Sequence, residues 1–381
     1  MNYPFDSDEG GKSFSAFPVW QDGVADMILP NTYGAALALL IISMFCWGSW
    51  ANTQKLSGKW RFELYYYDYS LGLLLCAVIA AYTAGQWLPQ ELTFSDNLLI
   101  AGKREMLWAG AAGAVFNLAN MLLVAAIAVS GMAVAFPIGI GLALVEGVVW
   151  NYALNPQGNP ILLFGGVFLV VGAIIVDAFA YSGYLDDQED AAKKAALQID
   201  PRAKKRPPKP TGAARGILLS IVSGLLMGAF YPMLELSRQG EIGLAPYSLA
   251  LLFGVGVLIS SLFYLPFFLN FPVEGEPIQT KDYLKGTVRQ HLLGIAGGLI
   301  WMVGGICNFA AAASPVTVQV GPAVSYALGQ GATMVSALWG LIVWREFKGA
   351  QPRVKAMIGF MLVLFIAGLS MVSMAPLHAS H

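Results

Sequence analysis

Residues 160–181 read PILLFGGVFLVVGAIIVDAFAY, a run of 22 residues in which Asp177 is the only charged side chain. A helix rises about 1.5 Å per residue, so about 20 such residues cross the hydrocarbon core of a bilayer, which is about 30 Å thick. Nine further apolar runs lie near residues 33–55, 64–86, 107–129, 131–154, 214–236, 246–269, 291–313, 316–344 and 354–375. Strands of a membrane barrel would alternate apolar and polar residues over about ten positions, and these continuous runs do not. The sequence therefore predicts an all-α integral membrane protein with ten transmembrane helices.

The composition of the 381 residues agrees with a chain that lies in a lipid bilayer. Hydrophobic residues make up 57% and charged residues 12%, with a mean hydropathy of +0.62. A soluble chain carries about twice that charged fraction. The three cysteines, Cys46, Cys76 and Cys307, fall in three different predicted helices without paired spacing, so we expect neither a disulfide framework nor a metal site. No cofactor and no nucleic-acid partner is expected.

The distribution of basic residues predicts the orientation in the membrane. Only four of the 22 lysines and arginines fall on the side of the termini, namely Lys12, Lys103, Arg104 and Arg238. All the others fall on the opposite side, which the positive-inside rule makes cytoplasmic. We therefore expect a multi-pass protein of the plasma (inner) membrane with both termini outside the cytoplasm.

The predicted organisation has five parts. They are a polar extracytoplasmic lead (1–32), a first half of five helices (33–181), a charged cytoplasmic linker (182–213), a second half of five helices (214–375) and a short C-terminal tail (376–381). The lead lacks the positive n-region of a secretory signal. The linker contains the run RAKKRPPKP at 202–210, whose prolines stiffen it.

The two halves resemble each other in sequence. WGSW at 47–50 recurs as MGAF at 227–230, and each is followed by Leu-Ser and then by Tyr-Ser-Leu, at 69–71 and at 247–249. Because five is an odd number of helices, two such copies must lie in the membrane with opposite topology. This inverted-repeat arrangement is typical of secondary transporters, which bind substrate near the midplane between the repeats.

Several stretches resemble known transporter families. The segment VSALWGLIVWREF at 335–347 resembles the ninth helix of plant ureide permeases, and the preceding Gln330 extends the likeness to bacterial glucose/ribose porters. YDYS at 67–70, with AYTAG at 81–85, is similar to the second ureide permease helix, and GMAVAFPI at 131–138 is similar to the fourth helix of the sugar porters. The likeness covers nearly all the membrane part and falls within the drug/metabolite transporter superfamily. It implies uptake of a small polar metabolite such as a ureide, nucleobase or sugar, commonly by proton symport.

Two departures from those families limit what the likeness implies. Where the sugar porters carry a glutamine after the fourth-helix proline, this chain has Ala143, and Glu146 follows three residues later. A nucleotide loop is also missing, because Asp6 stands where the leading glycine of Gly11-Lys12-Ser13 should be. The expected energy source is therefore a gradient and not ATP.

Glu146 is the predicted proton-coupling residue. It lies near mid-depth in the fourth predicted helix, where an ionisable group costs several kcal/mol unless it faces a cavity or a partner. The alternatives are a structural pair with a neighbour such as Lys55, or a hydrated position near the outer interface. Asp177, Glu235 and Arg238 are predicted to lie at the membrane interfaces.

Neutral polar and aromatic groups at depth are the predicted substrate ligands. An amide donates and accepts hydrogen bonds, which suits a ureide or a sugar hydroxyl equally. Aromatic rings stack on a flat ligand. The predicted substrate-binding residues are Asn117, Asn120, Asn308, Gln330, Trp47 and Tyr326. The alternative role of the asparagines is hydrogen bonding between helices, worth about 0.6 kcal/mol and up to about 2.

An enzyme is not expected, because the histidines are only His291, His378 and His381 and no nucleophile or metal-ligand cluster accompanies them. The leading hypothesis is a secondary active transporter, a proton symporter that takes up a small neutral metabolite. An exporter of the same superfamily, or a membrane sensor that binds without transporting, remains the alternative. The sequence does not specify the substrate, the direction of transport, the coupling ion or the oligomeric state.

Overall fold

The computed structural model describes residues 30–86, 93–130, 132–199, 213–272, 276–318 and 320–378. These residues form helices joined by short connections, and the described part of the chain contains no strand. Its spans are α2 (Tyr33–Ser49) continued by α3 (Ala51–Leu56), α4 (Phe62–Tyr82), α6 (Lys103–Ser130), α7 (Met132–Leu154), α8 (Pro160–Ile199), α9 (Ala213–Arg238), α10 (Pro246–Asn270), α11 (Val288–Ala312), α12 (Pro322–Gly329) with α13 (Ala332–Leu338) and η3 (Trp339–Val343), and α14 (Pro352–Met374). Short helices are α5 (Phe94–Ile100), η1 (Thr280–Lys285), η2 (Val316–Val318) and η4 (Pro376–His378). Ten helices of the described chain are long and apolar enough to cross a membrane, which confirms the predicted fold class.

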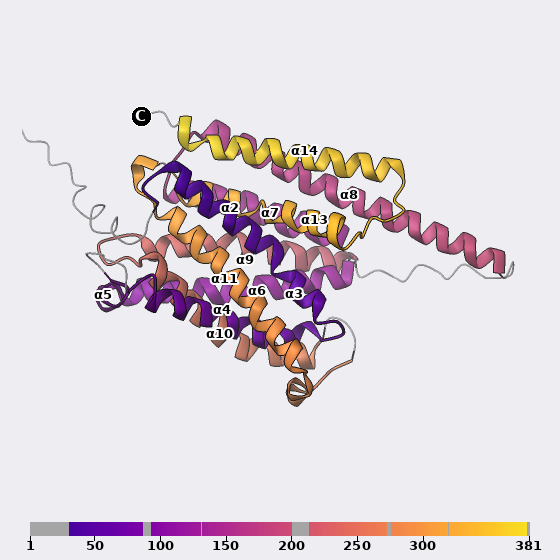
Figure 1. Cartoon of the computed structure of the whole chain (residues 1–381), viewed down its shortest axis with the longest axis horizontal. Helices are drawn as coiled ribbons and strands as arrows, with labels where there is room; N and C mark the ends of the chain where they lie inside the picture. The colour runs from indigo at the N-terminus through magenta and orange to yellow at the C-terminus, as the bar shows by residue number, and fades with distance from the viewer. Residues whose placement is uncertain are drawn as a thin grey trace, which may run out of the picture.

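The spans pack side by side as a bundle along the long axis of the molecule (Figure 1). α8 and α14 form one edge, and α4 and α10 lie along the opposite edge. Glycines bring backbones close together at both edges: a Cβ built on Gly166 of α8 would lie 2.6 Å from the Gly368 carbonyl oxygen of α14, and one on Gly298 of α11 would lie 2.0 Å from that of Tyr69 in α4. Small residues at such crossings are what membrane helices use to pack tightly.

The two ends of the described chain lie at the same end of the bundle. The Tyr33 hydroxyl at the start of α2 donates a hydrogen bond to the Ser373 carbonyl oxygen near the end of α14. We call this the terminal end, and the opposite end, where α8 and α9 are joined, the linker end. Placement of both ends together agrees with ten crossings, whereas the side of the membrane that each faces stays a prediction. Residues 1–29 of the predicted lead lie outside the described residues.

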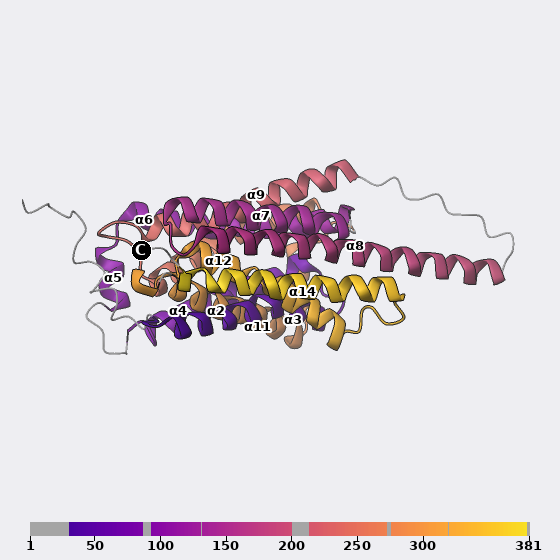
Figure 2. The same ribbon diagram turned by 90° about the horizontal axis from the view of Figure 1, so that it is seen from above.

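Helix α8 is much longer than its predicted span. It continues through the acidic and basic segment as far as Ile199, so the first part of the predicted linker is helical, and Figure 2 shows its end projecting beyond the other helices. The reason is local composition, because DDQEDAAKKAALQ at 186–198 is rich in strong helix formers and the first proline comes only at Pro201. Residues 200–212, which hold the basic and proline-rich run, lie outside the described residues.

The ninth span, predicted as one helix over 316–344, is divided. α12 ends at Gly329, Gln330 and Gly331 form a tight turn, α13 follows, and the last turn is the π-helical η3. Gly331 lets this turn pack closely against α2, because a Cβ there would lie 2.5 Å from the Met44 sulfur. Discontinuous helices of this kind mark binding sites in transporters.

Candidate functional site

A fully buried asparagine joins four helices in the middle of the bundle. Asn308 of α11 accepts a hydrogen bond from the Tyr231 hydroxyl of α9 at 2.5 Å. Its amide nitrogen donates to the Ser43 hydroxyl of α2 at 3.3 Å and to the Ser325 carbonyl oxygen of α12 at 3.0 Å. We call Ser43, Trp47, Tyr231, Asn308, Ser325 and Tyr326 the central cluster. It contains no charged side chain.

Two of the predicted aromatic residues complete this cluster. Trp47 stacks on Trp301 with ring centres 5.4 Å apart, and its Nε1 donates to the Trp301 carbonyl oxygen at 3.1 Å. The Tyr326 ring lies 5.1 Å from that of Tyr231, and its hydroxyl lies 3.1 Å from the Met227 carbonyl oxygen. Gly329 lets Trp47 approach, because a Cβ there would lie 2.6 Å from the indole. The rings therefore enclose the amide of Asn308.

Gln330 follows directly after Gly329, at the turn between α12 and α13. Its side chain is half-buried and has no hydrogen-bond partner among the described residues. Of the six predicted ligands, Trp47, Asn308 and Tyr326 are thus brought together, and Gln330 lies at the end of α12, the helix that carries Tyr326.

The other two predicted ligands face different neighbours. The Asn117 amide nitrogen donates to the hydroxyls of Ser260 at 2.8 Å and Ser261 at 3.0 Å, and so connects α6 to α10. Asn120 donates to the Tyr66 hydroxyl of α4 at 3.1 Å. Tyr66 in turn lies against Tyr69, with ring centres 4.7 Å apart, so Asn120 belongs to an aromatic wall beside the central cluster.

Three polar atoms in this region are buried without a partner among the described residues. They are the Tyr69 hydroxyl, the Ser325 Oγ and the Asn117 Oδ1. Leaving a buried polar atom unpaired costs about 1–3 kcal/mol, so such atoms mark positions where a polar ligand or water is stabilised. Sequence patterns gave no signal for Ser325, which looks like an ordinary helix residue, whereas Tyr69 drew notice only as part of the repeated Tyr-Ser-Leu and of the YDYS segment.

Glu146 lies on α7 beside the central cluster. Its Oε2 is buried without a hydrogen-bond partner, and a Cβ on Gly228 of α9 would lie 2.9 Å from it. Gly147, the next residue, packs against the Tyr326 ring, where a Cβ would lie 2.3 Å away. Lys55, the neighbour considered as a structural partner, instead pairs with Glu346 at 2.5 Å.

A cavity of about 260 Å³ opens at the linker end. Its polar lining includes Asn52, Lys55, Asp177, Ser336, Trp339 and Glu346. The Lys55 ammonium lies 4.3 Å from the Trp344 ring centre, and the Trp344 indole donates to Asn52 at 2.6 Å. The segment resembling ureide permeases (335–347) forms one wall. Asp177, predicted to be interfacial, therefore lines a cavity.

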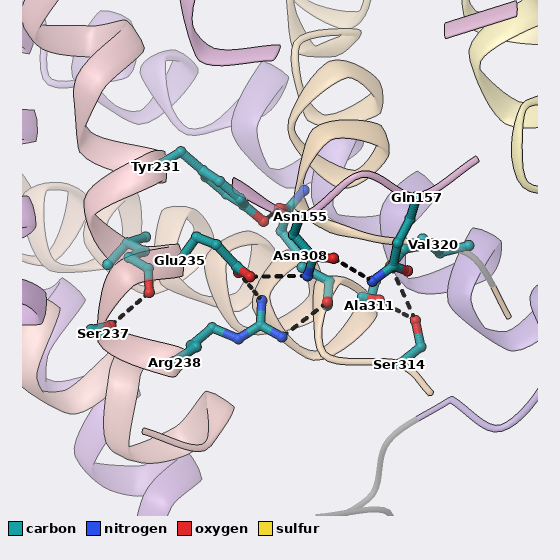
Figure 3. Close-up of polar contacts among 12 residues, drawn as sticks. Asn155, Gln157, Tyr231, Glu235, Ser237, Arg238, Asn308, Ala311, Ser314 and Val320 are labelled. Atoms are coloured by element: carbon teal, nitrogen blue, oxygen red, sulfur yellow. Dashed lines mark hydrogen bonds and ion pairs between the residues drawn. The ribbon is translucent and has the colours of Figure 1, made fainter. Parts of the chain in front are cut away.

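The terminal end holds a buried polar network that sequence reasoning missed (Figure 3). Arg238 donates to Glu235 at 3.1 Å and to the Ala312 carbonyl oxygen at 3.0 Å. Asn155 donates to the other Glu235 oxygen at 3.0 Å, and Gln157 donates to Asn155 at 2.9 Å. We call Asn155, Gln157, Glu235 and Arg238 the terminal-end network. Asn155 and Gln157 looked like loop residues because nothing local shows that they turn inward.

No metal centre is found, since the described residues contain no group of three histidine, cysteine or acidic side chains that could hold an ion. The described cysteines are free. The arrangement offers a neutral centre lined by aromatic and amide groups, with one unpaired carboxylate oxygen beside it. A cavity of about 260 Å³ lies at the linker end, and a smaller one of about 120 Å³ lies beside Arg238 at the terminal end.

Comparison with known proteins finds likenesses to membrane permeases. The ureide permease family model matches residues 65–211. Ureide permease 2 of Arabidopsis thaliana is 26% identical, over 92% of this chain and all of its own length, and ureide permease 1 of the same plant is 23% identical over the same shares. Transmembrane protein 144 homolog B of Dictyostelium discoideum is 24% identical over 42% of this chain and 41% of its own. One solved crystal structure of a protein superposes with a TM-score of 0.55 at 13% identity, over 92% of this chain and all of the other, which is a likeness of fold alone.

The relatives that span the whole chain are named as permeases, which are transporters, so the prediction of a transporter and not an enzyme agrees with them. The predicted link to glucose/ribose porters stays a prediction. With ten apolar spans, the chain is a multi-pass membrane protein that is similar to ureide permeases.

Proposed function

We propose that this protein is a secondary active transporter that takes up a small neutral metabolite, with ureides ahead of nucleobases and sugars. The observation that carries the proposal is the central cluster, an uncharged site of amide, hydroxyl and aromatic groups that retains a buried oxygen without a partner. The full-length likeness to ureide permeases supports the choice of substrate class.

The chemistry of the cluster suits a planar ligand with adjacent N–H and C=O groups. The free amide of Gln330 can donate and accept at once, and the unpaired Ser325 hydroxyl adds a further group. Trp47, which is half-buried and stacks on Trp301, is the ring proposed to stack on such a ligand. A phosphorylated compound would need a fixed positive charge, and the cluster has none.

Glu146 is proposed as the group that carries the coupling proton. An unpaired carboxylate oxygen within a membrane span is stable mainly when it is protonated or hydrated, because a bare charge there is costly. Its position beside Gly147, which packs on Tyr326, lets a change in its charge reach the central cluster.

Alternating access between two five-helix halves, 33–181 and 214–375, is the proposed mechanism, with the linker on the cytoplasmic side and both termini outside. The larger cavity at the linker end, about 260 Å³ against about 120 Å³ beside Arg238, and the buried ion pair at the terminal end support it, since a transporter more open to one side has this asymmetry.

Counterflow in proteoliposomes tests the function. The protein is reconstituted with unlabelled allantoin inside, and entry of labelled allantoin is followed; uracil, xanthine, glucose, ribose and rhamnose are compared as competitors. We expect transient accumulation that Gln330→Ala abolishes and that Gln351→Ala, a change at an exposed glutamine, leaves intact. Binding without counterflow would indicate a sensor. Net depletion of allantoin from intact cells would indicate an exporter.

A further inference from the structure

A buried carboxylate and a histidine meet at the linker end, apart from the central cluster and Glu146. Asp68 of α4 is 2% exposed. One of its oxygens accepts a hydrogen bond from the Tyr283 hydroxyl of η1 at 2.5 Å, and the other lies 2.8 Å from Nδ1 of His291 in α11. The contact joins α4, α11 and the connection between α10 and α11.

The surroundings hold this pair in place. Gly294, one turn after His291, lies directly against Asp68, where a Cβ would be 2.4 Å from the Asp68 Cβ. The imidazole is enclosed by the rings of Tyr283 and Trp60, with ring centres at 4.6 Å and 5.6 Å. No larger residue at position 294 could keep this geometry.

The charge of the pair depends on a single proton. Among the described residues that hydrogen-bond to Asp68, only His291 can become positively charged, since Tyr283 donates as a neutral hydroxyl. A further titratable side chain near the pair is Tyr65 of α4, whose hydroxyl is engaged with Thr53 at 2.6 Å. Helix η1 carries two lysines and one aspartate: Lys285 pairs with Asp282 at 2.6 Å, and Lys281 leaves a net positive charge of one.

The proton can be exchanged with water. The His291 side chain is 25% exposed, whereas Asp68 is buried behind it, so the imidazole is the accessible member of the pair. Histidine is the side chain that titrates in the physiological range. When the imidazole gives up its proton, the hydrogen bond from Tyr283 still stabilises the carboxylate, so the site survives both states.

We propose that the Asp68–His291 pair is a second proton-binding site, which exchanges its proton with the linker-end water. The role of this site in transport rests on the proposed proton-coupled function, whereas the binding of a proton by the pair does not. α11 also carries Trp301 and Asn308, so a proton on the pair strengthens the tie between α4 and the helix that forms the central cluster.

The first test does not depend on transport. Full-length protein with His378→Gln and His381→Gln retains a single histidine, and its ¹⁵N-labelled imidazole is titrated by NMR between about pH 5 and 8. We expect Asp68→Asn to change the titration curve. Glu63→Gln, which removes a carboxylate paired with Arg61 on the same helix, should leave the curve unchanged. An imidazole that does not titrate, or one indifferent to Asp68→Asn, overturns the site.

The second test concerns its role. Asp68→Asn and His291→Gln should each lower proton-driven allantoin accumulation by about tenfold or more, while counterflow stays within about twofold of the unmodified protein. Normal accumulation in both variants overturns the coupling role. If the unmodified protein shows no counterflow of any candidate substrate, the proposed function fails, and the NMR titration still decides whether the pair binds a proton.

Discussion

The two ends of the bundle each carry an ion pair, in opposite settings. At the terminal end, the side chains of Arg238 and Glu235 are 15% and 4% exposed and are tied to Asn155, Gln157 and a backbone carbonyl. At the linker end, Lys55 and Glu346 are each 44% exposed and border a cavity of about 260 Å³. An ion pair is thus buried among further hydrogen-bond partners at one end, and an ion pair borders an opening at the other.

The difference indicates which of the two ion pairs is harder to separate. A buried pair is stable only when further hydrogen bonds satisfy it, and removing one partner leaves an uncompensated charge. An exposed pair contributes little and can separate cheaply. The buried pair of the terminal-end network is therefore expected to be the harder one to separate, whereas the exposed linker-end pair borders the cavity of about 260 Å³.

The largest expected effect is on stability at the terminal end. Arg238→Met should lower the free energy of unfolding by about 3–5 kcal/mol because Glu235 stays buried without its partner. Lys55→Met, the matched change at the exposed pair, should cost less than about 1 kcal/mol. Unfolding in mixed micelles measures both. Equal losses would mean that the two pairs are equivalent and that the comparison is wrong.

The second largest difference is expected in the rate at which a maleimide labels cysteines placed at the two ends. In a background with Cys46, Cys76 and Cys307 replaced by alanine, Ser336→Cys lines the cavity and Ser314→Cys is buried near the terminal-end network. We expect a maleimide to label position 336 about a hundredfold faster than position 314, since the latter needs local opening. Comparable rates would show that the terminal end is not closed.

The same background tests which side each end faces. Phe5→Cys should react with an impermeant reagent in intact cells, whereas Ala203→Cys should react only after lysis, because the basic linker is predicted to be cytoplasmic. Labelling of position 203 but not of position 5 in intact cells reverses the orientation.

A moderate effect is expected for Glu146, which lies beside the central cluster. Glu146→Gln mimics the protonated state permanently, so proton-driven accumulation should fall by about tenfold or more while counterflow persists. Glu241→Gln, at an exposed carboxylate, is the control. Accumulation against a gradient with normal pH dependence in Glu146→Gln would remove this residue from the coupling mechanism.

The smallest effect on substrate binding is expected from replacing Asn117, whose hydrogen bonds connect α6 to α10. Asn117→Ala should cost about 0.6–2 kcal/mol of stability, as interhelical hydrogen bonds in membranes do, and leave the affinity for allantoin within about twofold. Thermal melting and binding on the same sample separate the two. A large loss of affinity would place Asn117 in the substrate site and enlarge it.

Sequence predicted the ten spans well because lipid requires every spanning segment to satisfy its own backbone, which leaves a strong hydropathy signal. It did not predict the turn at Gln330, where Gly331 packs closely against Met44 of a distant helix. Nor did it predict the burial of Glu235 and Arg238, since their partners Asn155 and Gln157 come from a distant connection. Asn308 and Trp47 were found because an amide and an indole at depth are unusual, whereas Asp68 was passed over as part of a matching motif.

The length of α8 makes its C-terminal end a sensitive reporter of tilt in the membrane part. Its 40 residues extend for about 60 Å, which is about twice the thickness of the hydrocarbon core. We therefore expect its last turns to lie outside the bilayer as a continuous helix. A tilt of the membrane part by about 10° would swing the tip, about 30 Å away, through about 5 Å. Conformational change too small to see among the packed helices is thus magnified where a fluorophore pair can record it.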